Sequence, residues 1–310
     1  MATWTRSLLR VAGAAAAAPV ALCAGQMYYV RAKFKLPPDA SGPLTGVASI
    51  GPQKTKRRRN IVFLGDSIVT GVGCSVEASR EHGPILPRRV AQLIAETIGE
   101  DVGWTALGET GADVRMMSAR LLPSLQNETQ RVRAIGERVD AVVILTGLND
   151  IKECFLFAQP HTHHPWRFGS LLASLLGSIC DVADEPSAVL VAGTPVDAVP
   201  RFNKLWPLSA AMSGVCGVWE NQKRVAAEAA QTARALLRQQ EGQAAGPVIQ
   251  FLEPPPGMIN TLLDGANYFA EDGMHPNDAG YAVWADIIAT RLLKSFEEEG
   301  RAQAQLEARS

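Results

Sequence analysis

The chain lacks several features that mark common functional classes. Its 30 basic and 31 acidic residues leave almost no net charge, whereas a nucleic-acid-binding domain usually has a basic excess. Gly71 and Gly73 do not form the G-x-G-x-x-G pattern of a dinucleotide site. The five cysteines include no C-x-x-C pair, which favours free thiols over a disulfide framework. These absences disfavour nucleic-acid binding, a dinucleotide cofactor and a small disulfide-stabilised fold.

Acidic residues are also missing from the N-terminal segment, where none occurs before Asp39. Basic residues flank an uncharged run from Val11 to Val30, and about twenty residues just span a bilayer as a helix. The run is rich in alanine and contains Pro19 and Gln26, so its insertion energy is marginal. Its length favours an anchor, but its composition weakens that interpretation.

Three interpretations of this segment compete: a transmembrane anchor, a signal peptide cut near Gly25, and an organelle transit peptide. We predict an anchor or targeting segment over residues 1–35, with membrane association through residues 8–30 as the first choice. Organelle targeting and secretion after cleavage are the alternatives. A helix packed on the rest of the protein is favoured least.

Residues 36–59 are interpreted as a linker, because prolines and glycines break any regular period and a basic cluster closes the segment. Short apolar runs then alternate with longer amphipathic stretches. The runs predict strands at Ile61–Leu64, Gly103–Leu107, Ala141–Leu145, Ala188–Ala192 and Val248–Leu252. The stretches predict helices at Pro84–Ile98, Val114–Val132, Trp166–Val182, Trp219–Gln240 and Asn277–Phe296.

This alternation predicts one α/β domain over residues 60–296, followed by a polar, frayed tail over residues 297–310. Strands separated by helices form a parallel sheet covered on both faces. Ligands of such sheets bind beyond the carboxyl ends of the strands.

Polar groups follow the strands of this sheet at that edge. The first strand leads into Gly65-Asp66-Ser67, and the third ends in Gly147-Leu148-Asn149-Asp150. Gly111 follows the second strand, and Asp272-Gly273-Met274-His275 follows the fifth. Because these segments meet at one edge of the sheet, we expect them to form one site.

Each of these residues meets a need of ester cleavage. Ser67 becomes a nucleophile when a base such as His275 takes its proton, and Asp272 can hold the imidazole in one orientation. The amides of Ser67 and Gly111 and the side chain of Asn149 can donate to the oxyanion. Asp66 and Asp150 are expected to support the site by accepting hydrogen bonds from loop amides.

These four segments resemble the sequence blocks of the GDSL or SGNH hydrolases, in the same order and over residues from about Asn60 to Leu293. The resemblance implies a three-layer α/β/α sandwich around a five-stranded parallel, flavodoxin-like sheet. It also implies a serine esterase or lipase-like activity on small-molecule or lipid esters, with no metal or organic cofactor. One departure concerns the second block, whose usual asparagine is absent; Gly108 therefore competes with Gly111 for the oxyanion role.

Two alternatives to an esterase stay open at this point. One is an O-acetyl deacetylase or acyltransferase on carbohydrate or lipid, which would form the same acyl-enzyme. The other is a catalytically inert, membrane-tethered binding protein. The cluster of His161, His163 and His164 has no helical ligand spacing and no acidic or cysteine partner nearby, so a solvated loop is favoured there over a metal site.

Overall fold

A computed structural model of the chain describes residues 2–51, 58–156, 159–195, 198–241, 246–255 and 267–307. Part of the basic cluster in the linker (52–57) and the last residues of the polar tail (308–310) lie outside them. The strands are β1 (Thr45–Ala48), β2 (Arg59–Gly65), β3 (Val102–Gly108), β4 (Ala141–Leu145), β5 (Ala188–Ala192) and β6 (Val248–Leu252). The helices are α1 (Ala2–Lys33), α2 (Val76–His82), α3 (Ile85–Ile98), α4 (Val114–Met116), the π-helix η1 (Met117–Leu121), α5 (Leu122–Ala134), α6 (Leu148–Leu156), α7 (Pro160–His163), α8 (Pro165–Val182), α9 (Pro200–Asn203), α10 (Leu208–Glu241) and α13 (Asp278–Glu307).

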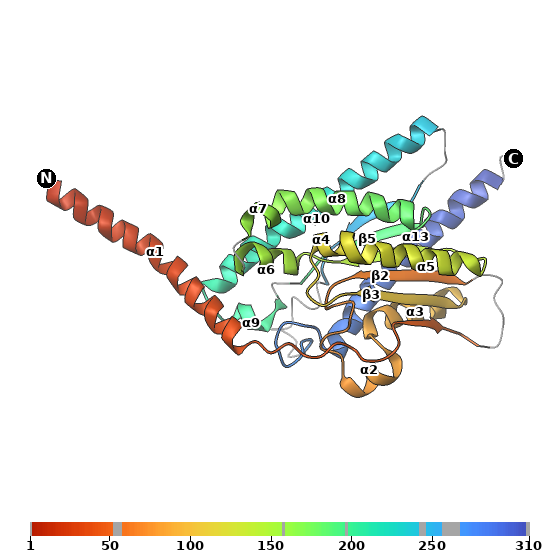
Figure 1. The fold of residues 1–310 in the computed structure, drawn as a ribbon, viewed down its shortest axis with the longest axis horizontal. Coiled ribbons are helices and arrows are strands. Elements are labelled where there is room, and N and C mark those ends of the chain that lie inside the picture. The colour runs from red at the N-terminus through yellow and green to blue at the C-terminus, as the bar shows by residue number, and fades with distance from the viewer. Residues whose placement is uncertain are drawn as a thin grey trace.

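The sheet has six strands in the order β1-β3-β2-β4-β5-β6 (Figure 1). All five predicted strands are present and run parallel to one another. The prediction of five strands is nevertheless incomplete, because β1 pairs antiparallel with β3 at the sheet edge. This strand lies in the segment interpreted as a linker. It escapes sequence analysis because it has only four residues between turn-forming ones and depends on its partner for its conformation.

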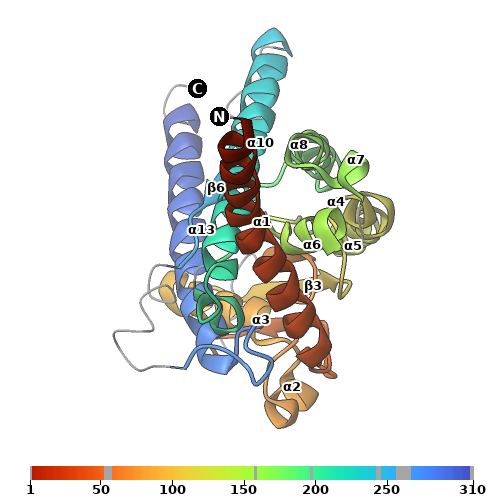
Figure 2. The ribbon, with the colours of Figure 1, turned by 90° about the vertical axis from the view of Figure 1, so that its left-hand side faces the viewer.

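Helices cover both faces of the sheet, as the predicted three-layer arrangement requires. Alternate strand residues point to opposite faces: Val142 and Ile144 of β4 join one core cluster, and Val143 and Leu145 join the other. The first cluster contains residues of α5, α8 and α10, and the second contains residues of α3 and α13. Figure 2 shows α13 on one side of the molecule and α5 and α8 on the other. The apolar runs of β2, β4 and β5 are therefore buried on both faces.

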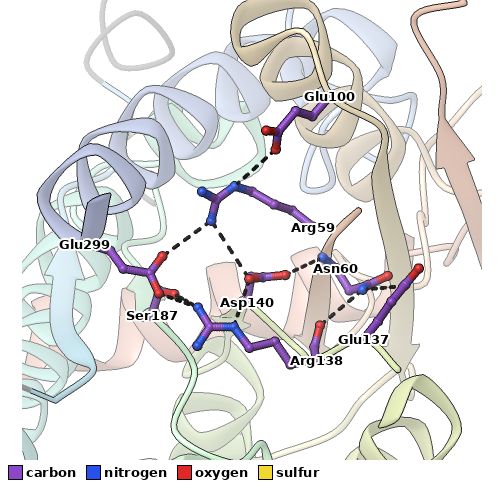
Figure 3. A network of polar contacts seen from close by, with 8 residues as sticks. All are labelled: Arg59, Asn60, Glu100, Glu137, Arg138, Asp140, Ser187 and Glu299. Carbon is purple, nitrogen blue, oxygen red and sulfur yellow. Dashed lines mark hydrogen bonds and ion pairs between the residues drawn. The ribbon is translucent and has the colours of Figure 1, made fainter. Parts of the chain in front are cut away.

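A polar network ties the amino ends of the central strands to the end of α13 (Figure 3). Asp140, which is fully buried, accepts hydrogen bonds from the Asn60 amide at 2.8 Å and from Nε of Arg138 at 3.1 Å. Arg138 and Arg59 both pair with Glu299. Residues 297–307 of the predicted frayed tail are helical, and these ion pairs hold α13 against the sheet at Glu299.

The second half of α1 packs on the domain, which was the interpretation favoured least. Val30 is buried in the first core cluster, and Cys23 and Met27 pack against that cluster at helical spacing. Gln26 donates to the carbonyl of Trp206 at 2.8 Å and accepts from the Leu208 amide at 3.1 Å. Among the residues that the structure describes, no helix has both the length and the apolar character needed to cross a bilayer.

All five cysteines are free thiols, as their spacing predicts. Cys154, Cys180 and Cys216 are buried. Burial raises the pKa of the Cys180 thiol to about 11, so it stays protonated near neutral pH. These cysteines act as small apolar side chains of the core.

Candidate active site

Ser67 lies in a tight turn directly after β2, at the carboxyl edge of the sheet. The carbonyl of Asp66 accepts hydrogen bonds from the amides of Val69 and Thr70 at 2.9 and 3.1 Å, which turns the chain away from the strand direction. The carboxylate of Asp66 accepts from the Ile68 amide at 3.0 Å. Ser67 itself is only 9% exposed. The turn therefore holds the hydroxyl in a fixed, largely water-excluded position.

The side chain of His275 connects Ser67 with Asp272. Its Nε2 lies 2.9 Å from Oγ of Ser67, and its Nδ1 lies 2.5 Å from Oδ2 of Asp272. A carboxylate can only accept a hydrogen bond, so Nδ1 must carry the proton. Nε2 of the neutral ring is then free to accept from the Ser67 hydroxyl. This arrangement can remove a proton from the serine during nucleophilic attack.

Asp272 is held in its ionised form by local hydrogen bonds. Burial alone would raise its pKa, but hydrogen bonds from His275 and from the Met274 amide outweigh burial and lower the pKa below its usual value. Its Oδ1 accepts from the amides of Met274 and His275 at 2.9 and 3.0 Å. The two side chains three positions apart therefore point the same way, as the sequence predicts for a tight loop.

Two backbone amides beside Ser67 are available to an oxyanion. Among the described residues, neither the amide of Ser67 nor that of Gly111 donates to an acceptor. Gly111 has a φ of +89° and open space where a Cβ would stand. Gly108 instead pairs with Gly65 in the sheet, and a Cβ there would lie 2.8 Å from Cγ2 of Thr70. The geometry thus favours Gly111 over Gly108.

Asn149 lies at the start of α6 and joins the two loops. Its Nδ2 donates to Oδ2 of Asp66 at 3.2 Å and to the carbonyl of Ala112 at 3.1 Å. Because Asp66 precedes Ser67 and Ala112 follows Gly111, these bonds bring the two candidate oxyanion donors close together. Both hydrogens of the Asn149 amide have protein acceptors here, so an oxyanion would compete with Asp66 and Ala112 for them.

Asp66 and Asp150 make the loop contacts expected of supporting residues. Asp150 is fully buried and both its carboxylate oxygens lie 3.3 Å from the Val114 amide. Burial, with a smaller effect from the neighbouring Asp113, raises the pKa of Asp150 to about 8. Burial also raises the pKa of Asp66. At neutral pH, Asp150 is therefore largely a neutral acid within the site.

Asp150→Asn is expected to flatten the dependence of thermal stability on pH. The pKa of Asp150 is about 8 in the folded protein but about 4 in an unfolded chain. Between these values the folded state binds one more proton than the unfolded state, so the free energy of unfolding falls as the pH rises. The amide side chain of the variant cannot titrate in this range. Melting temperatures of both proteins at intervals from about pH 5 to about pH 8 test this, and parallel curves would contradict it.

Three residues near the site, His163, Lys223 and Arg201, were missed or misjudged from the sequence. His163 lies buried, with Nε2 3.0 Å from Oδ2 of Asp113, so the solvated-loop interpretation is wrong for this histidine. Lys223 is also fully buried, and its Nζ donates to Oε1 of Glu220 at 2.7 Å and to Oγ1 of Thr194 at 3.0 Å.

The signals for these residues differ. Lys223 follows Trp219 by one helical turn and precedes Ala226 and Ala227, which are all buried. That spacing could have placed the lysine on the buried face of the helix. No comparable pattern marks His163 or the third residue, Arg201, which donates to the carbonyl of Asp272 at 2.7 Å.

Comparison with known proteins finds one matching family model and several similar solved structures of low sequence identity. The model of a family described as "GDSL-like Lipase/Acylhydrolase family" matches residues 63–283. None of the curated proteins compared matches the sequence.

The similar solved structures include an acetylxylan esterase, Axe2, from Geobacillus stearothermophilus, at 16% identity and a TM-score of 0.49, covering 76% of this chain and 94% of that one. The acetyl xylan esterase AlAXEase has 12% identity and a TM-score of 0.48, with coverages of 75% and 98%. LAE5, an alpha/beta hydrolase from the metagenome of Lake Arreo, Spain, has 18% identity and a TM-score of 0.45, with coverages of 76% and 96%. At these identities and TM-scores, the likenesses are no guide to the substrate of this chain.

Proposed function

Because this chain belongs to the GDSL-like lipase/acylhydrolase family and is an SGNH-type ester hydrolase, we propose that Ser67, His275 and Asp272 are its catalytic triad. The observation that carries the proposal is the continuous hydrogen-bonded path from Oγ of Ser67 through the imidazole to Oδ2 of Asp272. This path gives each residue a definite part in acyl transfer.

The reaction proceeds in two halves through an acyl-enzyme. His275 takes the proton of Ser67 as Oγ attacks the ester carbonyl, and Asp272 stabilises the imidazolium that forms. The alcohol then leaves with the proton from His275. Water repeats the sequence on the acylated serine and releases the carboxylic acid, which restores the free hydroxyl.

The oxyanion of each tetrahedral intermediate lies against the amides of Ser67 and Gly111. These donors are fixed by the turn after β2 and by the loop after β3, so they need no reorganisation as charge develops. Asn149 is a third donor once one of its amide hydrogens leaves Asp66 or Ala112. Removing one donor of such a hole typically costs about 3–4 kcal/mol of barrier.

Labelling with a fluorophosphonate tests the nucleophile directly. This probe phosphonylates a serine hydroxyl only when a base activates it, so we expect one label per chain, on the peptide that contains Ser67. Mass spectrometry of the digested protein locates the label. A label on another serine, or none on the folded protein, would refute the proposed triad.

A graded panel of esters would determine the substrate range. Hydrolysis of p-nitrophenyl esters from acetate to long acyl chains, beside acetylated sugars, measures which acyl and alcohol groups the site accepts. Adding an alcohol acceptor to the same assay separates hydrolysis from acyl transfer. Both reactions release p-nitrophenol, but hydrolysis leaves the free carboxylic acid whereas transfer forms a new ester with the added alcohol.

A further inference from the structure

Arg201 joins the loop that carries Asp272 to the N-terminal helix. It lies on α9, and its guanidinium Nη1 donates to the carbonyl of Asp272 at 2.7 Å. Its backbone amide donates to the carbonyl of Gly273 at 3.1 Å. The same guanidinium donates to the carbonyl of Val30 at 3.5 Å and lies 5.6 Å from the ring centre of Phe34. One side chain thus contacts two segments that are far apart in the sequence.

The Asp272 turn has little regular structure of its own to hold it. It connects Phe269 and Pro276, which form an isolated β-bridge, and Gly273 has a φ of +65°. Within the turn, the carboxylate of Asp272 accepts the amides of Met274 and His275. The bond from Nη1 of Arg201 fixes the other side of Asp272, its carbonyl oxygen, and the Arg201 amide holds the next carbonyl, that of Gly273. A turn held at both ends keeps the carboxylate within reach of the imidazole.

The end of α1 is a firm support for this contact. Val30 is only 6% exposed and lies in the first core cluster. The side chain of Gln26 forms hydrogen bonds with two backbone groups at the start of α10. Figure 1 shows the C-terminal end of α1 beside α9, while its other end projects away from the body. Gln26 and Val30 of α1 are thus fixed to the domain, although they precede the segment that matches the family, residues 63–283.

We propose that Arg201 is a positioning residue that fixes Asp272 beside His275, and that its contacts with Val30 and Phe34 make the packed face at the end of α1 part of the catalytic unit. This inference rests on the proposed function, because it concerns the orientation of that triad. A consequence concerns processing: a chain shortened near Gly25 keeps every one of these contacts, whereas a chain shortened near Lys35 loses all that α1 supplies.

Replacing Arg201 with methionine in the full chain tests the positioning role. Methionine keeps an apolar stem but donates no hydrogen bond, so we expect kcat for p-nitrophenyl acetate to fall about tenfold, with KM changed less than about twofold. The rate constant of fluorophosphonate labelling should fall by the same factor. Arg201→Lys restores one donor and should recover activity to within about threefold of the wild type.

The control is Arg133→Met, which removes an exposed arginine that pairs with Asp184 and should leave kcat unchanged. All rates are divided by the concentration of active sites, measured as the total of Ser67 labelled at completion. A structural role alone would lower that total and the melting temperature but not the rate per active site. Such a result, or an Arg201→Met variant with wild-type kcat, would overturn the inference.

The contribution of α1 is tested by placing one aspartate on either of its faces. Val30→Asp puts a charge into the core and should detach the end of the helix, whereas Tyr29→Asp alters a side chain that is 58% exposed. We expect kcat to fall about tenfold in the first variant and to stay unchanged in the second. The double variant Val30→Asp/Arg201→Met should be no slower than either single variant, because both break one connection.

The outcomes separate this inference from the proposed function. If the wild type hydrolyses esters through Ser67 but Val30→Asp keeps full kcat, or if the two changes multiply, only the inference is wrong. A wild type that takes no label at Ser67 overturns the proposed triad and the inference with it.

Discussion

Ser67→Ala is expected to lower kcat for p-nitrophenyl acetate by about 10⁵-fold, because it removes the atom that forms the acyl-enzyme. His275 and Asp272 have no other hydroxyl within the hydrogen-bonded path that the structure describes. The amides of Ser67 and Gly111 remain in the variant, so a residual rate above that in water is expected from the oxyanion donors alone. Steady-state hydrolysis at saturating substrate measures the loss.

Two comparisons make this result specific. Ser124→Ala removes a hydroxyl on the exposed side of α5 that donates to the carbonyl of Arg120, and it should leave kcat unchanged. The melting temperature of Ser67→Ala should stay close to that of the wild type, because the substitution leaves no large cavity. A Ser67→Ala protein that is folded and retains more than about a hundredth of the wild-type kcat would place the nucleophile elsewhere.

Asp140→Ala is expected to lower the free energy of unfolding by about 3–5 kcal/mol, the typical loss when one partner of a buried ion pair is removed. The carboxylate is completely buried and accepts from the Asn60 amide and from Arg138. Without the carboxylate, the Asn60 amide has no acceptor, and the Arg138 guanidinium loses one of its two anionic partners (Figure 3). Chemical denaturation monitored by circular dichroism gives the free energy.

An exposed ion pair is the matched control for Asp140. Glu253 pairs with Arg224 at 2.6 Å, but its side chain is 64% exposed, and surface pairs contribute about 0–1 kcal/mol. Glu253→Ala should therefore change the free energy of unfolding by less than about 1 kcal/mol. If Asp140→Ala lowered the free energy of unfolding no more than Glu253→Ala does, the buried network would not stabilise the fold as expected. Because Asp140 lies at the amino end of β4 and Asn149 follows its carboxyl end, kcat per folded Asp140→Ala molecule should stay near the wild-type value.

Much of the fold follows from local sequence, and the exceptions have a common cause. The predicted bounds of β4, β5 and β6 agree with the structure residue for residue. For β4 and β5 the reason is that each is a short apolar run that the sheet buries completely. The edge strand β1 and the last turns of α13 could not be found this way. The strand β1 depends on its pairing with β3, and α13 is attached at Glu299 by Arg59 and Arg138; these partners lie far away in the sequence.

In the candidate site, too, the residues marked by local sequence were predicted, whereas contacts between distant segments were not. Ser67, Gly111, Asn149 and His275 each follow a recognisable strand, so the sequence predicts both their chemistry and their meeting at one edge of the sheet. The packing of the end of α1 on the domain was the interpretation favoured least from the sequence, because the composition suggests a membrane and the contact with α10 leaves only a weak pattern of Cys23, Met27 and Val30. The compartment of the protein stays a prediction.

The sequence by itself therefore determined the five parallel strands and the identity of the residues that meet Ser67. It could do so because strand burial and the loops that follow each strand are local properties of the chain. Only the tertiary structure decided how these residues are held: Arg201 reaches Asp272 across 71 positions, and His163 meets Asp113 across 50. Such contacts depend on the packing of whole helices, which no local pattern records.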